Sequence, residues 1–327
     1  MTIKDEFHFI DKIKQTKNRQ PQLIEGIGDD AALYKAKPDY LEIVCADTMA
    51  EGVHFLKDVS SPVDIGYKAL AVNISDVAAM GGVPKYYLVT IAVPKNWSEE
   101  ELVGIYAGMD EIASLYSMDL IGGDTVSTSD KLVITVTVIG EVQRDKQRLR
   151  KDARPGDAVF VTGTIGDSAA GLQILLGNLS VDDYNASAFL VNRHKRPMPQ
   201  VKAAQLMSSA ERISLNDISD GLASELNELC EASCVKMIIE KDRVPLSDSL
   251  RSLNFEQHDE WILYGGEDFE LVGTVPPSAF DLLQKKCTDE GISLTKIGHV
   301  EAGPSEVLLI HNGKQTKLKK SGFNHFK

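Results

Sequence analysis

Hydrophobic and polar residues follow one another along the chain in runs that predict interleaved helices and strands. Ser61 followed by Pro62 is typical of a helix start, and Ser98 with Glu101 predicts a capping box for a second helix. Residues 132–139, LVITVTVI, are almost all β-branched and uncharged, which predicts a buried strand. The elements expected in the first part are a helix over 4–17, a strand over 41–46, a helix over 61–80, a strand over 86–93, a helix over 98–118 and a strand over 132–139.

Residues 143–157 interrupt this pattern, because six basic and two acidic side chains precede the turn residues Pro155 and Gly156. We place a domain boundary here and expect domains over 1–142 and 143–327. Beyond it we expect strands over 158–163, 235–240, 270–275 and 293–298, helices over 166–177, 220–232 and 277–290, and a hairpin turn at Asn312-Gly313. Strands and helices interleave in both parts, so the predicted class is α/β, or α+β.

Composition narrows the possible partners and location. The length of 327 residues fits two domains, and 43% hydrophobic with 25% charged residues is typical of a folded globular protein. A net charge of −13 argues against nucleic acid or an anionic membrane as a partner. The four cysteines are too few for a disulfide framework, and no second close pair completes a zinc site with Cys230 and Cys234. The first residues are charged throughout and lack an apolar signal segment, so we expect a cytoplasmic protein.

Acidic residues stand repeatedly beside glycines or near predicted strand ends, where a backbone can approach a ligand closely. Asp47 is expected to end a strand, and Asp76 to lie on a packed, alanine-rich helix. Asp217 and Asp220 are expected at i, i+3 spacing on one side of a helix, in a segment, DISD, that echoes NISD at 73–76. One such aspartate alone is usually a turn or cap residue. The full set is Asp29, Asp30, Asp47, Asp76, Asp124, Asp217, Asp220, Glu267 and Asp268.

This set of carboxylates predicts a magnesium site. If several converge, each like-charged pair ~4 Å apart costs about 4 kcal/mol at an effective dielectric constant of 20. Cations or raised pKa values relieve that repulsion. Oxygen ligands without accompanying histidine or cysteine favour magnesium over zinc, and magnesium commonly bridges carboxylates to substrate phosphates. We therefore expect the scattered acids to gather in the folded molecule around magnesium and a phosphate compound.

Several other chemistries are disfavoured. The chain has no G-x-x-x-x-G-K-[ST] loop, no protein-kinase signature and no G-x-S-x-G elbow. Residues 26–31 match G-x-G-x-x-A by spacing, but two adjacent aspartates there would repel a pyrophosphate. His54 is the histidine nearest an acidic motif, and an ordinary loop histidine is its simpler interpretation. The basic stretch 143–157 is either a solvated linker or the source of an arginine that binds a nucleotide phosphate.

With these residues assembled, the chain resembles the thiamine-monophosphate kinase family, within the aminoimidazole-ribonucleotide synthetase-like ATP enzymes. The resemblance extends from Gly26 to Phe323. The shared motifs are GIGDDAAL (26–33), ADTMAEGVHF (46–55), YKALAVNISDVAAMGG (67–82), LIGGDT (120–125), RPGD (154–157), TGTIGDSAAGL (162–172), DISDGL (217–222), GGEDFEL (265–271) and GFNHF (322–326). The His-Phe of the second motif, together with GGEDFEL and the terminal aromatic residue, points to the thiamine branch.

The resemblance implies roles for individual residues. Those implied to hold magnesium are Asp30, Asp47, Thr48, Asp76, Asp124, Asp217 and Asp220. Those implied to contact ATP are Tyr106, Gly123, Asp124, Arg150 and Ser219. Those implied to contact thiamine monophosphate are His54, Glu267 and Phe323. The family often has serine or threonine before the aspartate at 47, and here Ala46 removes that hydroxyl.

The resemblance also implies an activity and an assembly. Two α/β domains are expected, the first pairing in a homodimer through its sheet, with ATP between the N-terminal glycine-aspartate cluster and the dimer partner or second domain. The implied reaction is transfer of a phosphoryl group from ATP to thiamine monophosphate, giving thiamine diphosphate. Another member of the same group, of the selenophosphate or aminoimidazole-ribonucleotide synthetase type, is the first alternative. A catalytically inactive nucleotide-binding regulator is the second.

Overall fold

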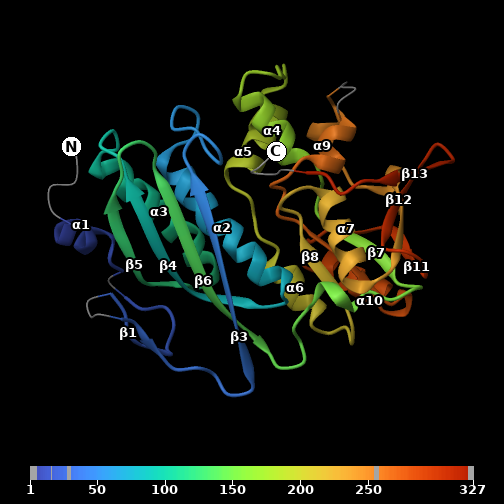
Figure 1. Cartoon of the computed structure of the whole chain (residues 1–327), viewed down its shortest axis with the longest axis horizontal. Coiled ribbons are helices and arrows are strands. Elements are labelled where there is room, and N and C mark those ends of the chain that lie inside the picture. Colours follow the sequence, from blue (N-terminus) through green and yellow to red (C-terminus); the bar gives the residue numbers. More distant parts are fainter. Residues whose placement is uncertain (1–5, 16, 28–30, 254–257, 323–327) are drawn as a thin grey trace. The chain divides into compact units, whose positions relative to one another are not determined.

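The computed structural model describes residues 6–15, 17–27, 31–253 and 258–322, and the chain forms two compact units (Figure 1). The first unit comprises residues 1–77 and 82–145. The second comprises 78–81 and 146–327, so the last residues of helix α2 belong to it. Both units combine helices with sheets, which confirms the predicted mixed α/β class. No helix in the described part of the chain is long and apolar enough to span a membrane.

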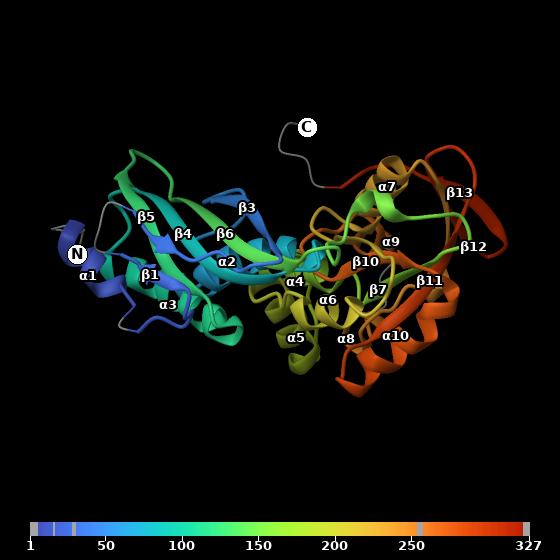
Figure 2. The ribbon, with the colours of Figure 1, turned by 90° about the horizontal axis from the view of Figure 1, so that it is seen from below.

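The first unit is built on a four-stranded sheet in the order β3-β6-β4-β5, in which only the β4–β5 pair is parallel. Helices α2 and α3 lie on one face of this sheet (Figure 2). Its elements are α1 (Glu6–Ile13), β1 (Leu23–Glu25), β2 (Leu33–Tyr34), β3 (Tyr40–Ala50), α2 (Pro62–Ala79), β4 (Val83–Val93), α3 (Glu99–Tyr116), β5 (Asp119–Ser127) and β6 (Val133–Gln143).

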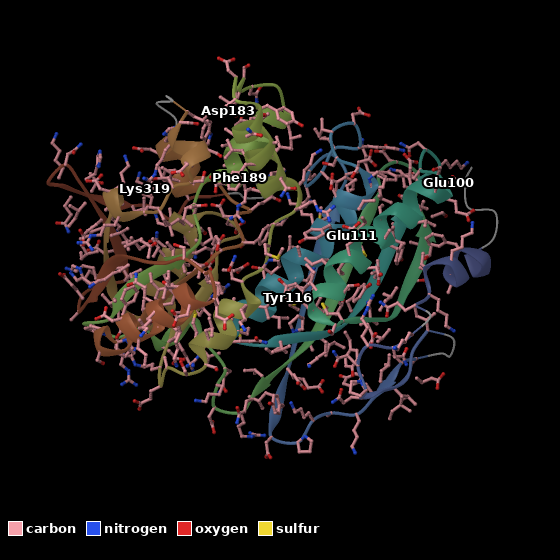
Figure 3. The ribbon with its side chains drawn as sticks, turned by 180° about the vertical axis from the view of Figure 1, so that it is seen from behind. Glu100, Glu111, Tyr116, Asp183, Phe189 and Lys319 are labelled. Atoms are coloured by element: carbon pink, nitrogen blue, oxygen red, sulfur yellow. The ribbon has the colours of Figure 1, made fainter. Side chains whose placement is uncertain are left out.

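Local sequence explains both helices of this layer. The predicted capping box of α3 is confirmed, since Ser98 and Glu101 each accept a hydrogen bond from the other's backbone N–H. The two helices approach backbone to backbone, because a Cβ at Gly66 would lie 1.8 Å from the Ile105 carbonyl oxygen. The outer side of α3 carries charged residues such as Glu111, which Figure 3 labels on its surface.

The opposite face of the sheet is covered only in part by the ribbon of β1 and β2. Leu23 and Tyr34 of that ribbon pack on Tyr86 and Ile139 at one end of the face. On this face, which we call the open face, Val44 of edge strand β3 lies beside Ile139 and is 67% exposed. The predicted uncharged strand is confirmed as an interior strand, β6.

The second unit contains a seven-stranded mixed sheet in the order β13-β12-β9-β11-β7-β10-β8. Its strands are β7 (Ala158–Thr162), β8 (Ser214–Asp217), β9 (Lys236–Glu240), β10 (Leu271–Val275), β11 (Leu294–Glu301), β12 (Glu306–His311) and β13 (Lys314–Leu318). Its helices are η1 (Arg150–Asp152), α4 (Asp167–Leu175), α5 (Tyr184–Lys195), α6 (Val201–Met207), α7 (Leu222–Ser233), η2 (Lys241–Arg243), α8 (Asp248–Arg251), α9 (His258–Tyr264) and α10 (Pro277–Asp289).

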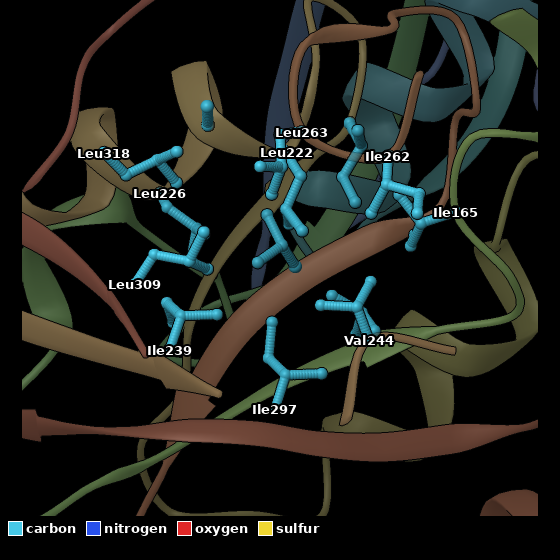
Figure 4. Close-up of a cluster of buried hydrophobic side chains, with 14 of the residues drawn as sticks. Ile165, Leu222, Leu226, Ile239, Val244, Ile262, Leu263, Ile297, Leu309 and Leu318 are labelled. Atoms are coloured by element: carbon cyan, nitrogen blue, oxygen red, sulfur yellow. The ribbon is translucent and has the colours of Figure 1, made fainter. Parts of the chain in front are cut away.

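Aliphatic side chains from this sheet and its helices form one core (Figure 4). Leu222 and Leu226 of α7 pack there with Ile239 and Ile297 of the sheet, and all four are buried. The predicted Asn312-Gly313 hairpin turn joins β12 to β13, with both residues at positive φ. The four cysteines are free thiols.

Candidate active site

Asp47 and Asp76 come together on the helix-covered face of the first unit. The expectation that Asp47 ends its strand is wrong, because β3 continues to Ala50. The Asp47 backbone N–H donates to Asn73 Oδ1 at 2.9 Å, and Asn73 lies one turn before Asp76 on α2. The two carboxyl groups lie within hydrogen-bonding distance of each other. A strand residue and a helix residue that are 29 positions apart thus form one acidic pair, the Asp47–Asp76 pair.

The electrostatics of this pair follow from burial and from the closeness of a second acid. Withdrawal from water raises the pKa of Asp47, while the hydrogen bond with Asp76 and the charge of His54 oppose that rise. Two carboxyl groups this close share a proton unless a cation replaces it. Burial, followed by the charges of Asp76 and Asp47, raises the pKa of the Cys45 thiol beside them. Cys45 therefore stays protonated, donating to the Asn73 carbonyl at 3.3 Å, and does not provide a thiolate ligand.

Asp124 does not join this pair within one chain. Thr48, Thr135, Thr90 and Asp124 share one row across the sheet, whereas Asp47 lies in the adjacent row, which faces the opposite side. Thr48 Oγ1 lies 2.8 Å from Thr135 Oγ1 in that row. From β3 to β5 there are three strand spacings, or roughly 14 Å. Asp47 and Asp124 of one chain therefore cannot ligate the same ion.

Gly123, beside Asp124, is fixed by close packing between strands. A Cβ there would lie 2.0 Å from the Val89 carbonyl oxygen of β4, and its φ is 155°. Only glycine fits this approach. The first motif of the sequence, Gly26–Ala31, leads from β1 into the short strand β2 rather than into a helix, which agrees with the exclusion of a dinucleotide loop. Asp30 lies outside the described residues.

His54 and Tyr106 occupy different environments in the first unit. His54 Nδ1 accepts the Ala50 N–H at 3.0 Å and interacts electrostatically with Asp47. Its loop is anchored by Glu51, which accepts from Trp97 Nε1 at 3.0 Å. Tyr106 is 7% exposed and its ring packs edge-on against Phe9. His54 thus lies near the acidic pair, and Tyr106 is largely buried, with its ring against α1.

In the second unit, Asp217 and Asp220 are not on a helix, which corrects the i, i+3 expectation. Asp217 ends β8, and Asp220 lies in the turn before α7 begins at Leu222. NISD at 73–76, by contrast, lies inside α2. The four-residue echo therefore joins two unlike structures and gives no support for duplication.

A buried glutamate that sequence reasoning missed organises the turn at 217–220. Glu225 accepts hydrogen bonds from the Asp220 N–H at 3.2 Å, from Ser219 Oγ at 3.4 Å and from Asn216 Nδ2. Burial, then the charge of Asp217, raises the pKa of Glu225 to about 8. Arg150 Nε donates to Asn216 Oδ1 at 3.0 Å, which places Arg150 in the same network.

The GGEDFEL segment lies directly against this turn. The Glu267 N–H donates to the Ser219 carbonyl at 2.7 Å, and the Phe269 N–H donates to the Ile218 carbonyl at 2.9 Å. Gly322 packs on the Asp220 carbonyl, which a Cβ would approach to 2.2 Å. The second unit thus gathers Asp217, Ser219, Asp220 and Glu267. Phe323 lies outside the described residues.

Two other acids of this segment serve the fold. Asp268, 1% exposed, accepts from the Gly166 N–H at 2.7 Å and the Ser168 N–H at 3.2 Å at the start of α4. Glu270 accepts from Arg193 at 2.8 Å and from Thr162 at 2.7 Å. Burial is the main cause that raises the pKa of Asp268 to about 7, with Arg193 opposing it. Asp268 thus binds the backbone N–H groups at the N-terminus of α4, where an anionic ligand could otherwise bind.

Within each unit, then, the predicted site residues meet only in part. Among the described residues, no group of three or more histidine, cysteine and carboxylate side chains is placed to hold a metal ion. The first unit offers the Asp47–Asp76 pair with His54 nearby, and the second offers the turn at 217–220 with Glu267. Each set contributes carboxylate oxygens, which are ligands for magnesium rather than for a soft metal, and backbone N–H groups, which can bind phosphate.

Comparison with known proteins identifies the family. Residues 28–142 match the model for the AIR synthase related protein N-terminal domain, and residues 154–311 match the C-terminal domain model. Thiamine-monophosphate kinase of Bacillus subtilis is 52% identical over 325 residues, covering 99% of this chain and 100% of that protein.

Solved structures agree with that result. The thiamine-monophosphate kinase of Stenotrophomonas maltophilia has a TM-score of 0.84 at 32% identity, covering 94% of this chain and 97% of that chain. AaThiL complexed with AMPPCP and TMP has a TM-score of 0.77 at 33% identity, covering 100% of this chain and 99% of that chain. The chain therefore belongs to the thiamine-monophosphate kinase family of AIR synthase related proteins.

Proposed function

We propose that this protein transfers the γ-phosphoryl group of ATP to thiamine monophosphate, forming thiamine diphosphate and ADP. The observation that carries the proposal is the 52% identity to a thiamine-monophosphate kinase over essentially the whole of both chains. The 33% identical AaThiL is solved with AMPPCP and TMP, which supports the same pair of substrates. That degree of identity to a kinase disfavours the selenophosphate and aminoimidazole-ribonucleotide synthetase alternatives.

This chemistry needs no general base. The acceptor is a phosphate oxygen with a second pKa of about 6, so it is largely ionised at neutral pH. Transfer depends mainly on in-line positioning and on reducing repulsion between two anions. In this proposal His54, Glu267 and Phe323 contact thiamine monophosphate, whereas Tyr106, Gly123, Asp124, Arg150 and Ser219 contact ATP.

The oxygen donors of both units fit magnesium. The raised pKa of Asp47 beside Asp76 and the protonated Cys45 thiol leave carboxyl oxygens suited to a hard cation. In this proposal Asp30, Asp47, Thr48, Asp76, Asp124, Asp217 and Asp220 hold the magnesium ions. When bound, magnesium neutralises phosphate charge and aligns the two substrates. The carboxylates supply the negative charge that keeps those cations in place.

We further propose a homodimer in which each chain completes the other's site. The open sheet face exposes apolar side chains, with Val44 67% and Val126 46% exposed on its two edge strands. Asp47 lies on edge strand β3 and Asp124 on edge strand β5. Two sheets paired face to face in a closed barrel would place β3 of one chain beside β5 of its partner. Asp124 of the partner subunit would then lie about one strand spacing from β3, instead of the three spacings that separate these strands within one chain.

A kinase assay tests the proposed function. Purified protein is incubated with ATP, magnesium and either thiamine monophosphate or thiamine, and thiamine diphosphate and ADP are separated by chromatography. We expect thiamine diphosphate from the monophosphate, none from thiamine, and none with excess EDTA. Tight ATP binding without any thiamine diphosphate would favour the inactive regulator instead. The cytoplasm, where ATP is supplied, remains our prediction for its location.

A further inference from the structure

The first observation is a buried histidine beside the GGEDFEL segment. His194, in the last turn of α5, is 7% exposed. Its Nδ1 lies 3.1 Å from Ser168 Oγ on α4 and 3.4 Å from Glu267 Oε2. One ring nitrogen therefore faces both a hydroxyl group that is fixed in the interior and a carboxylate at the surface.

The second observation concerns Glu267 itself. Its neighbours Asp268 and Glu270 are 1% and 2% exposed and point into the unit, whereas the Glu267 side chain is 30% exposed. Glu267 and Phe269 both have positive φ, at 67° and 51°. This left-handed backbone is costly for non-glycine residues and turns successive side chains in different directions. The segment thus holds Glu267 outward while its neighbours serve the core.

From this geometry we propose that His194 is a positioning residue, which, with Ser168, orients the Glu267 carboxylate toward the cationic ring of the acceptor. The inference rests on the proposed function, because thiamine monophosphate carries a permanently positive thiazolium ring. A surface glutamate samples several rotamers, and ordering it costs about 0.5–1.5 kcal/mol when a ligand binds. A buried histidine that already contacts the carboxylate removes much of that cost.

The neighbouring basic residue does not perform this role. Arg193 turns to the other side, where it binds Glu270 at 2.8 Å and lies 3.8 Å from Asp167. Arg193 therefore stabilises the buried acids, whereas His194 contacts the surface acid. Of these two adjacent residues of α5, Arg193 supports the fold, whereas His194 orients Glu267, the proposed substrate contact.

Steady-state kinetics of His194→Leu, which keeps a buried apolar volume without the ring nitrogen, test the proposal. We expect the KM for thiamine monophosphate to rise about 10-fold, with the KM for ATP and kcat changed less than about 2-fold. His194→Asn, which can place a nitrogen near the Nδ1 position, should restore most of the affinity. His299→Leu, at an exposed site on β11, is the matched control and should leave all three parameters unchanged.

A double-mutant cycle separates orientation from general structural support. In a Glu267→Gln background, the effect of His194→Leu on KM should largely disappear, because the carboxylate that it orients is gone. Equal effects in both backgrounds would overturn the proposal, as would a fall in kcat with equal rises in both KM values. If His194→Leu does not fold, Ser168→Ala should still raise the KM for thiamine monophosphate about 3-fold. An unchanged KM in a folded Ser168→Ala would overturn the proposal too.

The activity of the wild-type protein distinguishes failure of the proposed function from failure of the role proposed for His194. A wild type that makes no thiamine diphosphate overturns the proposed function, and the role of His194 with it. A wild type that is active, with a His194→Leu variant of unchanged KM, overturns only the role of His194.

Discussion

Two Gly-Gly-acid segments, one in each unit, have opposite structural outcomes. Asp124 follows Gly122-Gly123 on edge strand β5, and its side chain lies exposed on the open face of the sheet. Asp268 follows Gly265-Gly266-Glu267, is 1% exposed and accepts two backbone N–H groups. In both segments the acid directly after the glycines, Asp124 or Glu267, keeps contact with solvent, whereas Asp268, one position later, is used by the fold.

The difference shows that an acid indicates a site only when the fold leaves its charge unbalanced. Asp268 and Glu270 lie beside Arg193 and backbone donors, which offset part of the cost of burying these acids within the second unit. In the Asp47–Asp76 pair, by contrast, one acid lies beside another, and the charge of His54 also acts on Asp47. A proton or a cation relieves the repulsion between two such acids. A bound cation would need further ligands from other parts of the protein or from the substrates.

The largest expected effect comes from mixing two inactive variants, which tests whether Asp124 completes the site of a partner chain. Asp47→Asn and Asp124→Asn should each reduce kcat at least 100-fold, because each removes a magnesium ligand from both sites of a homodimer. Unfolding and refolding the two together should restore about a quarter of wild-type activity, since half of the dimers would hold one intact site. Activity of the mixture is read in the kinase assay.

The control is a mixture of Asp47→Asn with Asp76→Asn. Both substitutions lie in the same pair, so no combination of these chains contains an intact site and no activity should return. If the Asp47→Asn and Asp124→Asn mixture also stays inactive while wild-type protein refolds normally, Asp124 acts within its own chain or not at all.

Local sequence signals predicted the fold well because the responsible interactions are short-range. The Ser98–Glu101 capping box and the Asn312-Gly313 turn each involve residues at most three positions apart. The Asp47–Asp76 pair and the role of Glu225 depend on packing between elements, which spacing does not encode. Asp217 and Asp220 show the limit, since i, i+3 spacing also occurs where a strand ends and a helix has not yet begun. The roles of the site residues remain predictions.

The buried Asp268 should make the stability of the protein depend on pH. Its pKa in the folded protein is about 7, above the ordinary value of 3.8, mainly because of burial. The folded state therefore holds a proton that the unfolded state releases, so this contribution to stability is present below about pH 4 and is lost as the pH rises to about 7. The loss is at most about 4 kcal/mol. Between pH 4.5 and 7.5, the wild-type Tm should fall relative to that of Asp268→Asn.

Thermal unfolding followed by circular dichroism in metal-free buffer measures that slope. Asp183→Asn, which changes the N-cap of α5, removes one aspartate without touching the buried acids and should run parallel to wild type. Parallel curves for wild type and Asp268→Asn would mean that Asp268 does not carry the pH dependence.

The smallest expected effect is a rise in stability from removing one acid of the Asp47–Asp76 pair. Without divalent ions, Asp76→Asn should raise the free energy of unfolding by about 1 kcal/mol, because an amide beside Asp47 can donate a hydrogen bond where a second carboxylate repels. That corresponds to about 2–4 °C in Tm. Saturating magnesium should raise the Tm of the wild type by ligand linkage and leave the Asp76→Asn variant nearly unchanged. A variant less stable than wild type in EDTA would contradict this prediction. It would mean that the Asp76 carboxylate stabilises the fold even without a cation. The Asp47–Asp76 pair would then have a structural role, like Asp268 and Glu270.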